Sequence, residues 1–203
     1  MPIKLFINIL ALLILLSLPV HCRAGSWAAV SRNASRLKSV QAEFTQETHL
    51  KILTRPIISK GIFIFQAPNS LRWEYKSPIR SIMLMHDGRI RKYIQQDGRL
   101  VKEHGAGLAS MQIVLQEITH WLKGQFNSDS TFKVKLEKDN RIIFTPRNKA
   151  IARLINRIVL KLSDQPSLMD SVTIYEGPAS FTRLTFTKAK INQTVKASLF
   201  TDK

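Results

Sequence analysis

The sequence predicts a mainly β fold, in which helices cover the concave face of a strongly curved antiparallel sheet. Short segments of alternating apolar and polar residues follow one another from residue 40 to residue 200, which is typical of sandwiches and barrels. Asp-Gly pairs at 87–88 and 97–98 are strong signals for tight hairpins. Two stretches instead carry apolar residues at helical spacing, and such stripes need an apolar surface to cover. These helices and the net charge of +17 argue against a transmembrane barrel.

Two amphipathic helices are expected. The first is predicted over residues 27–37, with Ser26 as a candidate N-cap, because the apolar residues recur every three or four positions: Trp27, Val30, Ala34 and Leu37. The second is predicted over residues 108–122 and is closed by Gly124. Its wide apolar stripe is formed by Leu108, Met111, Val114, Leu115, Ile118, Trp121 and Leu122.

The remaining segments are predicted to be strands joined by turns rich in Pro, Gly, Asn and Asp. The first group, an antiparallel meander, lies before the second helix at residues 40–45, 57–65, 71–75, 79–85, 89–95 and 99–103. The second group lies at residues 132–136, 141–145, 157–162, 171–176, 181–190 and 195–200, with a short helical turn expected within 146–152. No repeat, linker or low-complexity stretch interrupts them, so residues 25–203 are expected to form one domain.

Residues 1–24 have the features of an export signal. Lys4 precedes an almost uninterrupted apolar run from Leu5 to Val20, and small residues suit cleavage after Ala24. The run is short for a spanning helix, which needs roughly 20 residues, although an uncleaved anchor remains an alternative. Lipidation of Cys22 fits poorly because His21 precedes it. We therefore expect a cysteine-free mature protein outside the cytoplasm, in the periplasm.

The chain is strongly basic, with 31 Lys and Arg against 14 Asp and Glu. Nucleic acid would be the first partner to consider for a cytoplasmic chain, but export argues against it. Anionic lipid head groups or an acidic partner are better matched to an exported protein. The densest cluster comprises Arg89, Arg91 and Lys92, which are candidates for docking to a partner or membrane. A solvated basic surface explains the same charges equally well.

The sequence gives no sign of an enzyme. It has no Gly-x-Ser-x-Gly elbow, no phosphate-cradling loop after a buried strand and no obvious pair of catalytic carboxylates. Its five histidines include no pair at metal-ligand spacing. No metal or cofactor is therefore expected.

Apolar residues are the remaining candidates for a binding site. The face of Leu71, Trp73 and Tyr75 is predicted to be the inner one, because the alternate residues are charged and expected to meet water. Candidate lining residues are Phe63, Phe65, Leu71, Trp73, Tyr75, Met83 and Met85, with Ile62 and Ile64 as the alternative inner pair on their strand. Met111, Leu115 and Trp121 are predicted to form the underside of a helical lid. Aromatic and Met side chains adapt to flexible acyl chains, but an ordinary core would have the same composition.

Several motifs resemble those of LolA-type outer-membrane lipoprotein carriers. The segment at 40–46 (VQAEFTQ) follows a short helix as in that family. The resemblance continues through residues 61–65 (GIFIF), 68–75 (PNSLRWEY), Pro78, the Asp-Gly at 87–88 and residues 142–147 (IIFTPR). It spans most of residues 26–200, and the order and spacing of the motifs carry it.

The resemblance implies an incomplete antiparallel β-barrel with an α-helical lid over a hydrophobic cavity. In the family, that cavity shields the acyl chains of lipoproteins between an inner-membrane exporter and an outer-membrane receptor, without ATP or a cofactor. Two departures are evident: Ala67 stands where the family has a lid-latching arginine, and the chain stops soon after Phe200. Both favour a divergent, LolA-like branch.

These observations predict a monomeric periplasmic carrier that ferries lipoproteins by their acyl chains from the inner to the outer membrane. The first alternative is a carrier, or a membrane-associated receptor, for a specialised non-lipoprotein lipid that works with an inner-membrane lipid exporter. A hydrolase acting on a lipid head group is the other, and it would require titratable side chains at the mouth of the cavity.

Overall fold

The fold, seen in a computed structural model, is described for residues 27–103, 118–126, 131–165 and 168–201. Eleven strands form one antiparallel sheet in the order β6-β5-β4-β3-β2-β1-β11-β10-β9-β8-β7. The first six strands are β1 (Ser39–His49), β2 (Ile57–Gln66), β3 (Ser70–Ser77), β4 (Ser81–His86), β5 (Arg89–Gln96) and β6 (Arg99–Glu103). The other five are β7 (Phe132–Glu137), β8 (Arg141–Pro146), β9 (Arg157–Leu162), β10 (Met169–Tyr175) and β11 (Phe181–Ile191).

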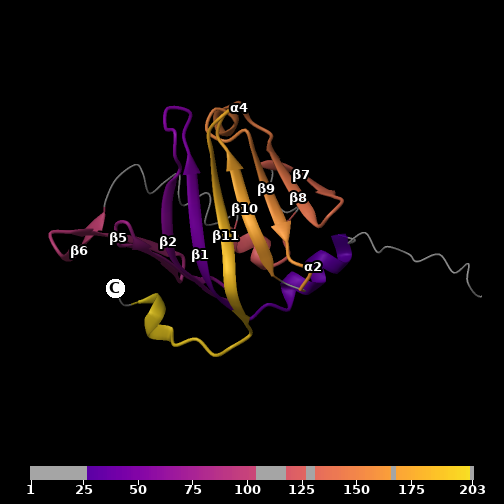
Figure 1. The fold of residues 1–203 in the computed structure, drawn as a ribbon. Coiled ribbons are helices and arrows are strands. Elements are labelled where there is room, and N and C mark those ends of the chain that lie inside the picture. The colour runs from indigo at the N-terminus through magenta and orange to yellow at the C-terminus, as the bar shows by residue number, and fades with distance from the viewer. Residues whose placement is uncertain (1–26, 104–117, 127–130, 166–167, 202–203) are drawn as a thin grey trace, which may run out of the picture.

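The sheet bends strongly, so that β5 lies across the direction of β1 and β11 (Figure 1). The edge strands β6 and β7 lie at opposite ends of the strand order, so the sheet is not closed into a barrel. The predicted mainly β, curved and incomplete barrel is thereby confirmed. Within each half of the sheet, neighbouring strands follow one another in the sequence, and the pairing of β1 with β11 joins the two halves.

Hairpin turns form where the sequence predicts them. Asp87 and Asp97 have φ of 49° and 47°, and Asp139 and Asn140 have φ of 59° and 56°. Two adjacent residues with positive φ match the right-handed twist of the flanking strands, which is why Asp-Gly and Asp-Asn stand there. The meander predicted for the first six strands is therefore correct, and β7 to β11 also follow one another in order across the sheet.

Besides the C-terminal segment, the described chain contains three helical segments. Helix α2 (Trp27–Ser35) confirms the first predicted helix. Residues 118–122 are helical, in agreement with the end of the second predicted helix, while its beginning lies outside the described residues. The short helix α4 (Lys149–Ala152) is capped by Asn148, whose side chain accepts a hydrogen bond from the Ile151 backbone N–H.

The main core lies on the concave face of the sheet and reaches from α2 to β10. Its largest fully buried side chains include Phe44, Phe65, Phe144, Ile158 and Leu160. Two smaller clusters lie outside this core, one around Ile64, Val195 and Phe200 and one around Ile82, Leu84 and Tyr93. The second half of β2 and strand β4 are therefore buried on both faces.

The strand predicted over residues 195–200 is wrong. The chain leaves the sheet at Asn192, which has a φ of 56°, and ends in the 3₁₀ helix η1 (Ala197–Phe200). Both sides of β11 are already paired, with β1 and β10, so this segment has no adjacent edge to join. Its apolar residues Val195 and Phe200 instead become buried against Ile64 on the outer face of the sheet.

The prediction that the outer face of β3 meets water is also wrong. Arg72 and Glu74 are only 7% and 6% exposed, because the C-terminal segment lies over them. An Nη1 donor of Arg72 bonds the Leu199 carbonyl at 3.0 Å. Charge alternation along β3 identified the two faces correctly but not what covers the outer one.

Candidate ligand cavity on the concave face

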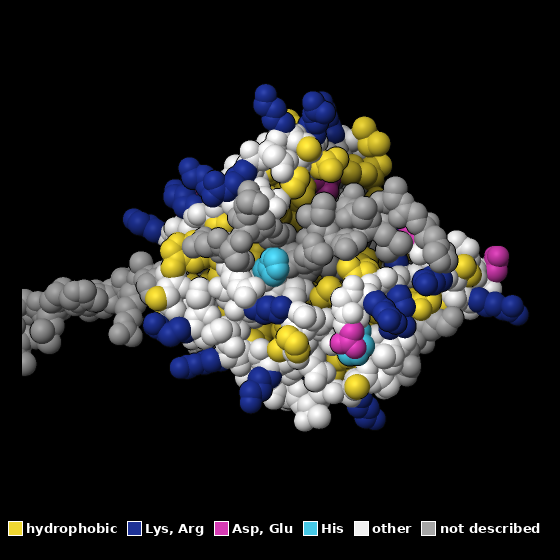
Figure 2. All heavy atoms as spheres, turned by 180° about the vertical axis from the view of Figure 1, so that it is seen from behind, with side chains coloured by type: hydrophobic (Ala, Val, Ile, Leu, Met, Phe, Trp, Pro, Cys, Tyr) yellow, Lys and Arg dark blue, Asp and Glu magenta, His cyan; other side chains and the backbone are white. Residues whose placement is uncertain are grey.

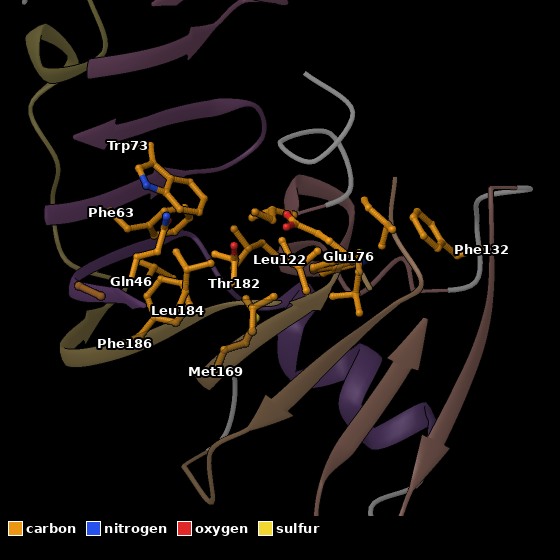
Figure 3. Close-up of a pocket in the computed structure, with 18 of the residues that line it drawn as sticks. Gln46, Phe63, Trp73, Leu122, Phe132, Met169, Glu176, Thr182, Leu184 and Phe186 are labelled. Atoms are coloured by element: carbon orange, nitrogen blue, oxygen red, sulfur yellow. The ribbon is translucent and has the colours of Figure 1, made fainter. Parts of the chain in front are cut away.

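A cavity of about 680 Å³ lies on the concave side of the sheet. Strands β1, β2, β3, β7, β9, β10 and β11 contribute to its wall, together with residues 118–122 and the α4–β9 turn. In Figure 3, Phe63 and Trp73 lie on one side of this space and Phe132 lies on the far side. Its lining is mainly apolar, and its volume falls within the range of about 300–1,000 Å³ found for ligand sites.

Three of the seven predicted lining residues border the cavity: Phe63, Trp73 and Tyr75. Phe63 and Trp73 make an edge-to-face contact with ring centroids 5.5 Å apart. The Phe63 and Phe65 side of β2 therefore faces inward, and Ile62 and Ile64 face outward. Phe65, Leu71, Met83 and Met85 belong to the same core but are packed within it, where they do not line the cavity.

Much of the cavity wall comes from residues that the sequence did not single out, in β9, β10 and β11. They are Ile158, Met169, Val172, Ile174, Leu184 and Phe186. Apolar and polar residues alternate along β10 and β11 in the sequence. The pairing of β10 with β9 is irregular between Met169 and Ser171, however, and this changes which residues of β10 face the cavity. The cross-strand pair Val172 and Leu184 would have been found by extending the inner-face argument from β3 to the second meander.

The described end of the second helix forms part of the cavity wall. Ile118, Trp121 and Leu122 line it, and the Trp121 ring lies 4.4 Å from that of Phe144. Of the predicted lid residues, Trp121 is thus placed at the cavity, whereas Met111 and Leu115 lie outside the described residues.

The helix end is held by contacts with α2 and with the β2–β3 turn. Gly124 has a φ of +76°, and a Cβ there would collide with the Ser31 backbone of α2. Lys123 Nζ donates a hydrogen bond to Asn69 Oδ1 in the β2–β3 turn. Ala67, at the position of the family's latching arginine, is exposed in the same turn.

Two hydrogen-bonded polar side chains, Tyr75 and Gln46, lie in the wall of the cavity. The Tyr75 hydroxyl donates a hydrogen bond to Gln46 Oε1 at 2.6 Å. Burial raises the pKa of Tyr75 to about 12, and the neighbouring Trp73 indole offsets this only in part. Tyr75 therefore stays neutral at physiological pH and contributes a fixed dipole to the wall.

The mouth of the cavity lies at one end of the strands, beside the turns that precede β9 and β11. Among the lining residues, Arg153, Leu154 and Glu176 are exposed, and all three belong to the α4–β9 and β10–β11 turns. Arg153 and Glu176 are single charges of opposite sign rather than a pair of carboxylates. Within the described chain, no three His, Cys, Asp or Glu side chains gather into a possible metal site.

The predicted basic docking cluster does not share one face. Arg91 lies on the outer face, where its Nη2 donates to the Phe200 carbonyl at 3.1 Å. Lys92 faces the other way and pairs with Glu103 at 2.7 Å. Arg89 is the exposed member of the three. A docking role for this group stays a prediction that its geometry does not favour.

Fold and cavity together define a class of protein: an open half-barrel with an apolar cavity on its concave side. The chain belongs to the family described as outer membrane lipoprotein carrier protein LolA, whose model matches residues 35–203. This assignment confirms the resemblance seen in the sequence, and the family is one of carriers rather than enzymes. No curated protein matches the chain.

Several solved structures are similar to this chain at low identity. A DUF1329 family protein from Desulfovibrio piger is 8% identical, with 86% of this chain and 95% of that one covered and a TM-score of 0.48. LprF from Mycobacterium bovis is 12% identical, with coverages of 84% and 92% and a TM-score of 0.44. A LolA superfamily protein from Nitrosomonas europaea is 8% identical, with coverages of 87% and 98% and a TM-score of 0.41.

Proposed function

We propose that this chain is a periplasmic carrier that binds the acyl chains of lipoproteins in the concave-face cavity and ferries them from the inner to the outer membrane. The observation that carries the proposal is an apolar cavity of about 680 Å³ in a member of a lipoprotein carrier family. The family supplies the class of cargo, and the cavity supplies a place for it.

The chemistry of the cavity wall suits acyl chains. Moving a methylene group out of water gains about 0.8 kcal/mol, so a carrier needs apolar area rather than reactive groups. Aromatic rings at Phe63, Trp73 and Phe186 and the flexible Met169 provide such area in a shape that adapts to the ligand. Charged lining residues are confined to the mouth, where a polar head group would remain in water.

Residues 1–24 support the export that this function requires. We expect cleavage after Ala24 and release of a soluble carrier, with an inner-membrane exporter and an outer-membrane receptor as partners. Among the described residues, no helix is long and apolar enough to cross a membrane.

A second candidate is a carrier or receptor for a specialised non-lipoprotein lipid. Ala67 favours it, because the lid of this chain lacks the arginine that the family uses as a latch. The described end of the lid helix is held instead by the exposed Lys123–Asn69 contact. Exposed polar contacts of this kind stabilise by about 1 kcal/mol or less, which suits a cargo that is loaded and released easily.

The test is native mass spectrometry of the chain isolated from the periplasm, followed by extraction of its lipids. Co-purified lipoproteins would support the first proposal, and a single non-protein lipid would support the second. A chain that is consistently empty and takes up no fluorescent acyl probe would overturn both.

A further inference from the structure

Exposed large apolar side chains are concentrated at one end of the strands, where the turns meet. In the described chain they are Ile52, Leu53, Ile57, Ile58, Ile79, Val101, Leu154 and Ile191. Six of them, all but Val101 and Ile191, belong to the β1–β2, β3–β4 and α4–β9 turns or to the beginning of β2, and antiparallel pairing places these turns at the same end of the strands. Val101 lies in the middle of the edge strand β6. Ile191, at the end of β11, lies at the opposite end of the strands and is the least exposed of the eight, at 38%.

Three turns at this end of the strands lie at or beside the mouth of the cavity, and we call them the mouth rim: residues 50–56, 147–156 and 176–180. The Lys51 backbone N–H donates to Ser180 Oγ at 3.3 Å, which joins the first turn to the third. The Asn156 backbone N–H donates to the Tyr175 carbonyl at 2.6 Å, which joins the second turn to the end of β10. Figure 1 shows the β1–β2 tip and α4 together at the top of the molecule.

The mouth rim combines protruding aliphatic residues with positive charge. Ile52 is 86% exposed and Leu154 is 63% exposed, each at the tip of its own turn. The rim contains one carboxylate, Glu176, and five cationic residues, namely Lys51, Arg55, Arg147, Lys149 and Arg153. From the opposite side, Figure 2 shows hydrophobic side chains near the top of the molecule beside Lys and Arg side chains.

We propose that the mouth rim docks onto the surface of an anionic phospholipid bilayer, with Ile52 and Leu154 inserted among the lipids. Exposed apolar side chains mark a contact with a protein or a membrane, and Ile52 and Leu154 stand on two separate turns, where each could enter a bilayer without a matching pocket on the partner. The five cations complement the negative surface of such a bilayer, since each basic residue close to it adds to the attraction.

Docking in this orientation would point the mouth of the cavity at the membrane. Leu154 both lines the mouth and protrudes from the rim, so the apolar wall would continue from the cavity into the bilayer. An acyl chain could then pass between the two with little exposure to water. This consequence rests on the proposed carrier function, whereas docking itself rests only on the exposed residues and their charges.

Flotation of the chain with lipid vesicles tests the proposal. Residues 25–203 contain every element of the described fold and are free of the apolar segment at 5–20, which would bind lipid by itself. We expect this chain to float with vesicles of phosphatidylethanolamine and phosphatidylglycerol, and much less with phosphatidylcholine alone. Salt at about 0.5 M should weaken the binding by screening the charges.

Variants distinguish binding through the mouth rim from nonspecific adsorption to lipid. Ile52→Ser combined with Leu154→Ser should lower the partition coefficient at least about tenfold, because two aliphatic side chains no longer leave water. Ile191→Ser, at the opposite end of the strands, should leave it unchanged. Equal effects of the two changes, or no flotation of the parent chain on anionic vesicles, would overturn the proposal and leave the rim to a protein partner.

A fluorescent label gives an independent measurement of orientation. Cys22 is the only cysteine of the sequence, so residues 25–203 offer no competing thiol. An environment-sensitive dye on Ile52→Cys should shift to the blue when anionic vesicles are added, and the same dye on Ile191→Cys should not. A shift at both sites, or at neither, would contradict the proposed orientation.

The two proposals fail in different experiments. Uptake of a fluorescent acyl probe is measured without vesicles and depends on the cavity alone. Flotation is measured without a probe and depends on the rim alone. Ile52 does not line the cavity, so a loss of flotation in Ile52→Ser with probe uptake retained would support docking while leaving the carrier proposal intact.

Discussion

The ring of Phe44 on β1 lies over Gly61, its cross-strand partner on β2. A Cβ atom at Gly61 would stand 2.6 Å from Phe44 Cζ and would also collide with the Glu74 backbone carbonyl on β3. The missing side chain lets Phe44 meet Tyr75 and Trp73 edge to face, with ring centroids 5.1 and 5.5 Å away. The glycine that begins the GIFIF motif therefore makes room for the aromatic wall beside the cavity.

Gly61→Ala should lower the free energy of unfolding by about 1–3 kcal/mol, because overpacking forces the ring or the backbone to shift. Urea denaturation followed by tryptophan fluorescence measures this loss. Gly177→Ala is the matched control, since a Cβ at Gly177 would meet nothing within 4 Å. Equal stability of the two variants would show that the Phe44 ring does not depend on Gly61.

The outer face of β3 carries a buried ionic group beneath the C-terminal segment. Glu74 accepts from Arg72 Nη2 at 2.8 Å and from Arg80 Nε at 3.0 Å. Burial acts to raise the pKa of Glu74, but the hydrogen bonds and charges of the two arginines outweigh it and hold the pKa below the ordinary 4.5. A lowered pKa means that Glu74 stabilises the fold above the pKa of the unfolded chain. This stabilisation is lost as the pH falls through the folded-state value.

Glu74→Gln should therefore cost about 3 kcal/mol at neutral pH, because the buried Arg72 loses its counter-charge and the more exposed Arg80 loses its partner. The difference from the parent chain should shrink as the pH falls through the lowered pKa of Glu74, because the parent carboxylate then becomes protonated as well. Thermal unfolding across this pH range tests both statements. Glu137→Gln, which breaks the exposed pair with Lys135, should change stability by less than about 1 kcal/mol at either pH.

The concave side of the sheet was largely predictable from the sequence, and the convex side was not. Alternation at Leu71, Trp73 and Tyr75 correctly separated the two faces of β3, and Asp-Gly pairs located two hairpins. Nothing local in the sequence indicates that residues 195–200 leave the sheet and cover Arg72. That arrangement depends on β1 and β10 having already occupied both sides of β11.

The cavity was predicted only on the side where the aromatic residues are dense. Phe63, Trp73 and Tyr75 were found because large side chains recur on one face of β2 and β3. Val172 and Leu184 were missed because their contribution comes from the pairing of β10 with β11, and pairing is not a local property. Packed core and cavity lining also have the same composition, which is why Leu71 and Met85 were assigned to the cavity.

Phe200 should be important for stability but not for the cavity. It is 1% exposed and is buried against Ile64 and Val195 on the outer face. Phe200→Ala should lower the free energy of unfolding by about 3–5 kcal/mol, and Phe200→Leu by less than about 1.5 kcal/mol. Uptake of an acyl probe by the folded fraction should be unchanged in both. Weaker uptake by the folded Phe200→Leu variant would mean that the outer cluster shapes the cavity through the sheet.

Ala42 offers the sharpest test of the cavity itself. It is buried in the wall on β1, opposite Phe63 on β2, and its small side chain leaves space that the ligand would occupy. Ala42→Phe fills part of that space from β1, at the irregularity in its pairing with β11. Because each methylene kept in water costs about 0.8 kcal/mol, loss of contact with only two of them should raise the dissociation constant of an acyl probe about tenfold.

Titration of the probe into the purified variant measures this change, and Ala197→Phe on the exposed surface of η1 is the matched control. A thermal unfolding curve close to that of the parent chain would show that the new ring lies in space that was empty before. If Ala42→Phe bound the probe as tightly as the parent chain, the acyl chain would have to lie elsewhere, and the concave cavity would not be the carrier site. If it bound weakly only because it had unfolded, the unfolding curve would reveal this, and Ala42→Leu would then provide the smaller increment. Loss of binding with the fold retained is thus the result that ties the apolar lining to its cargo.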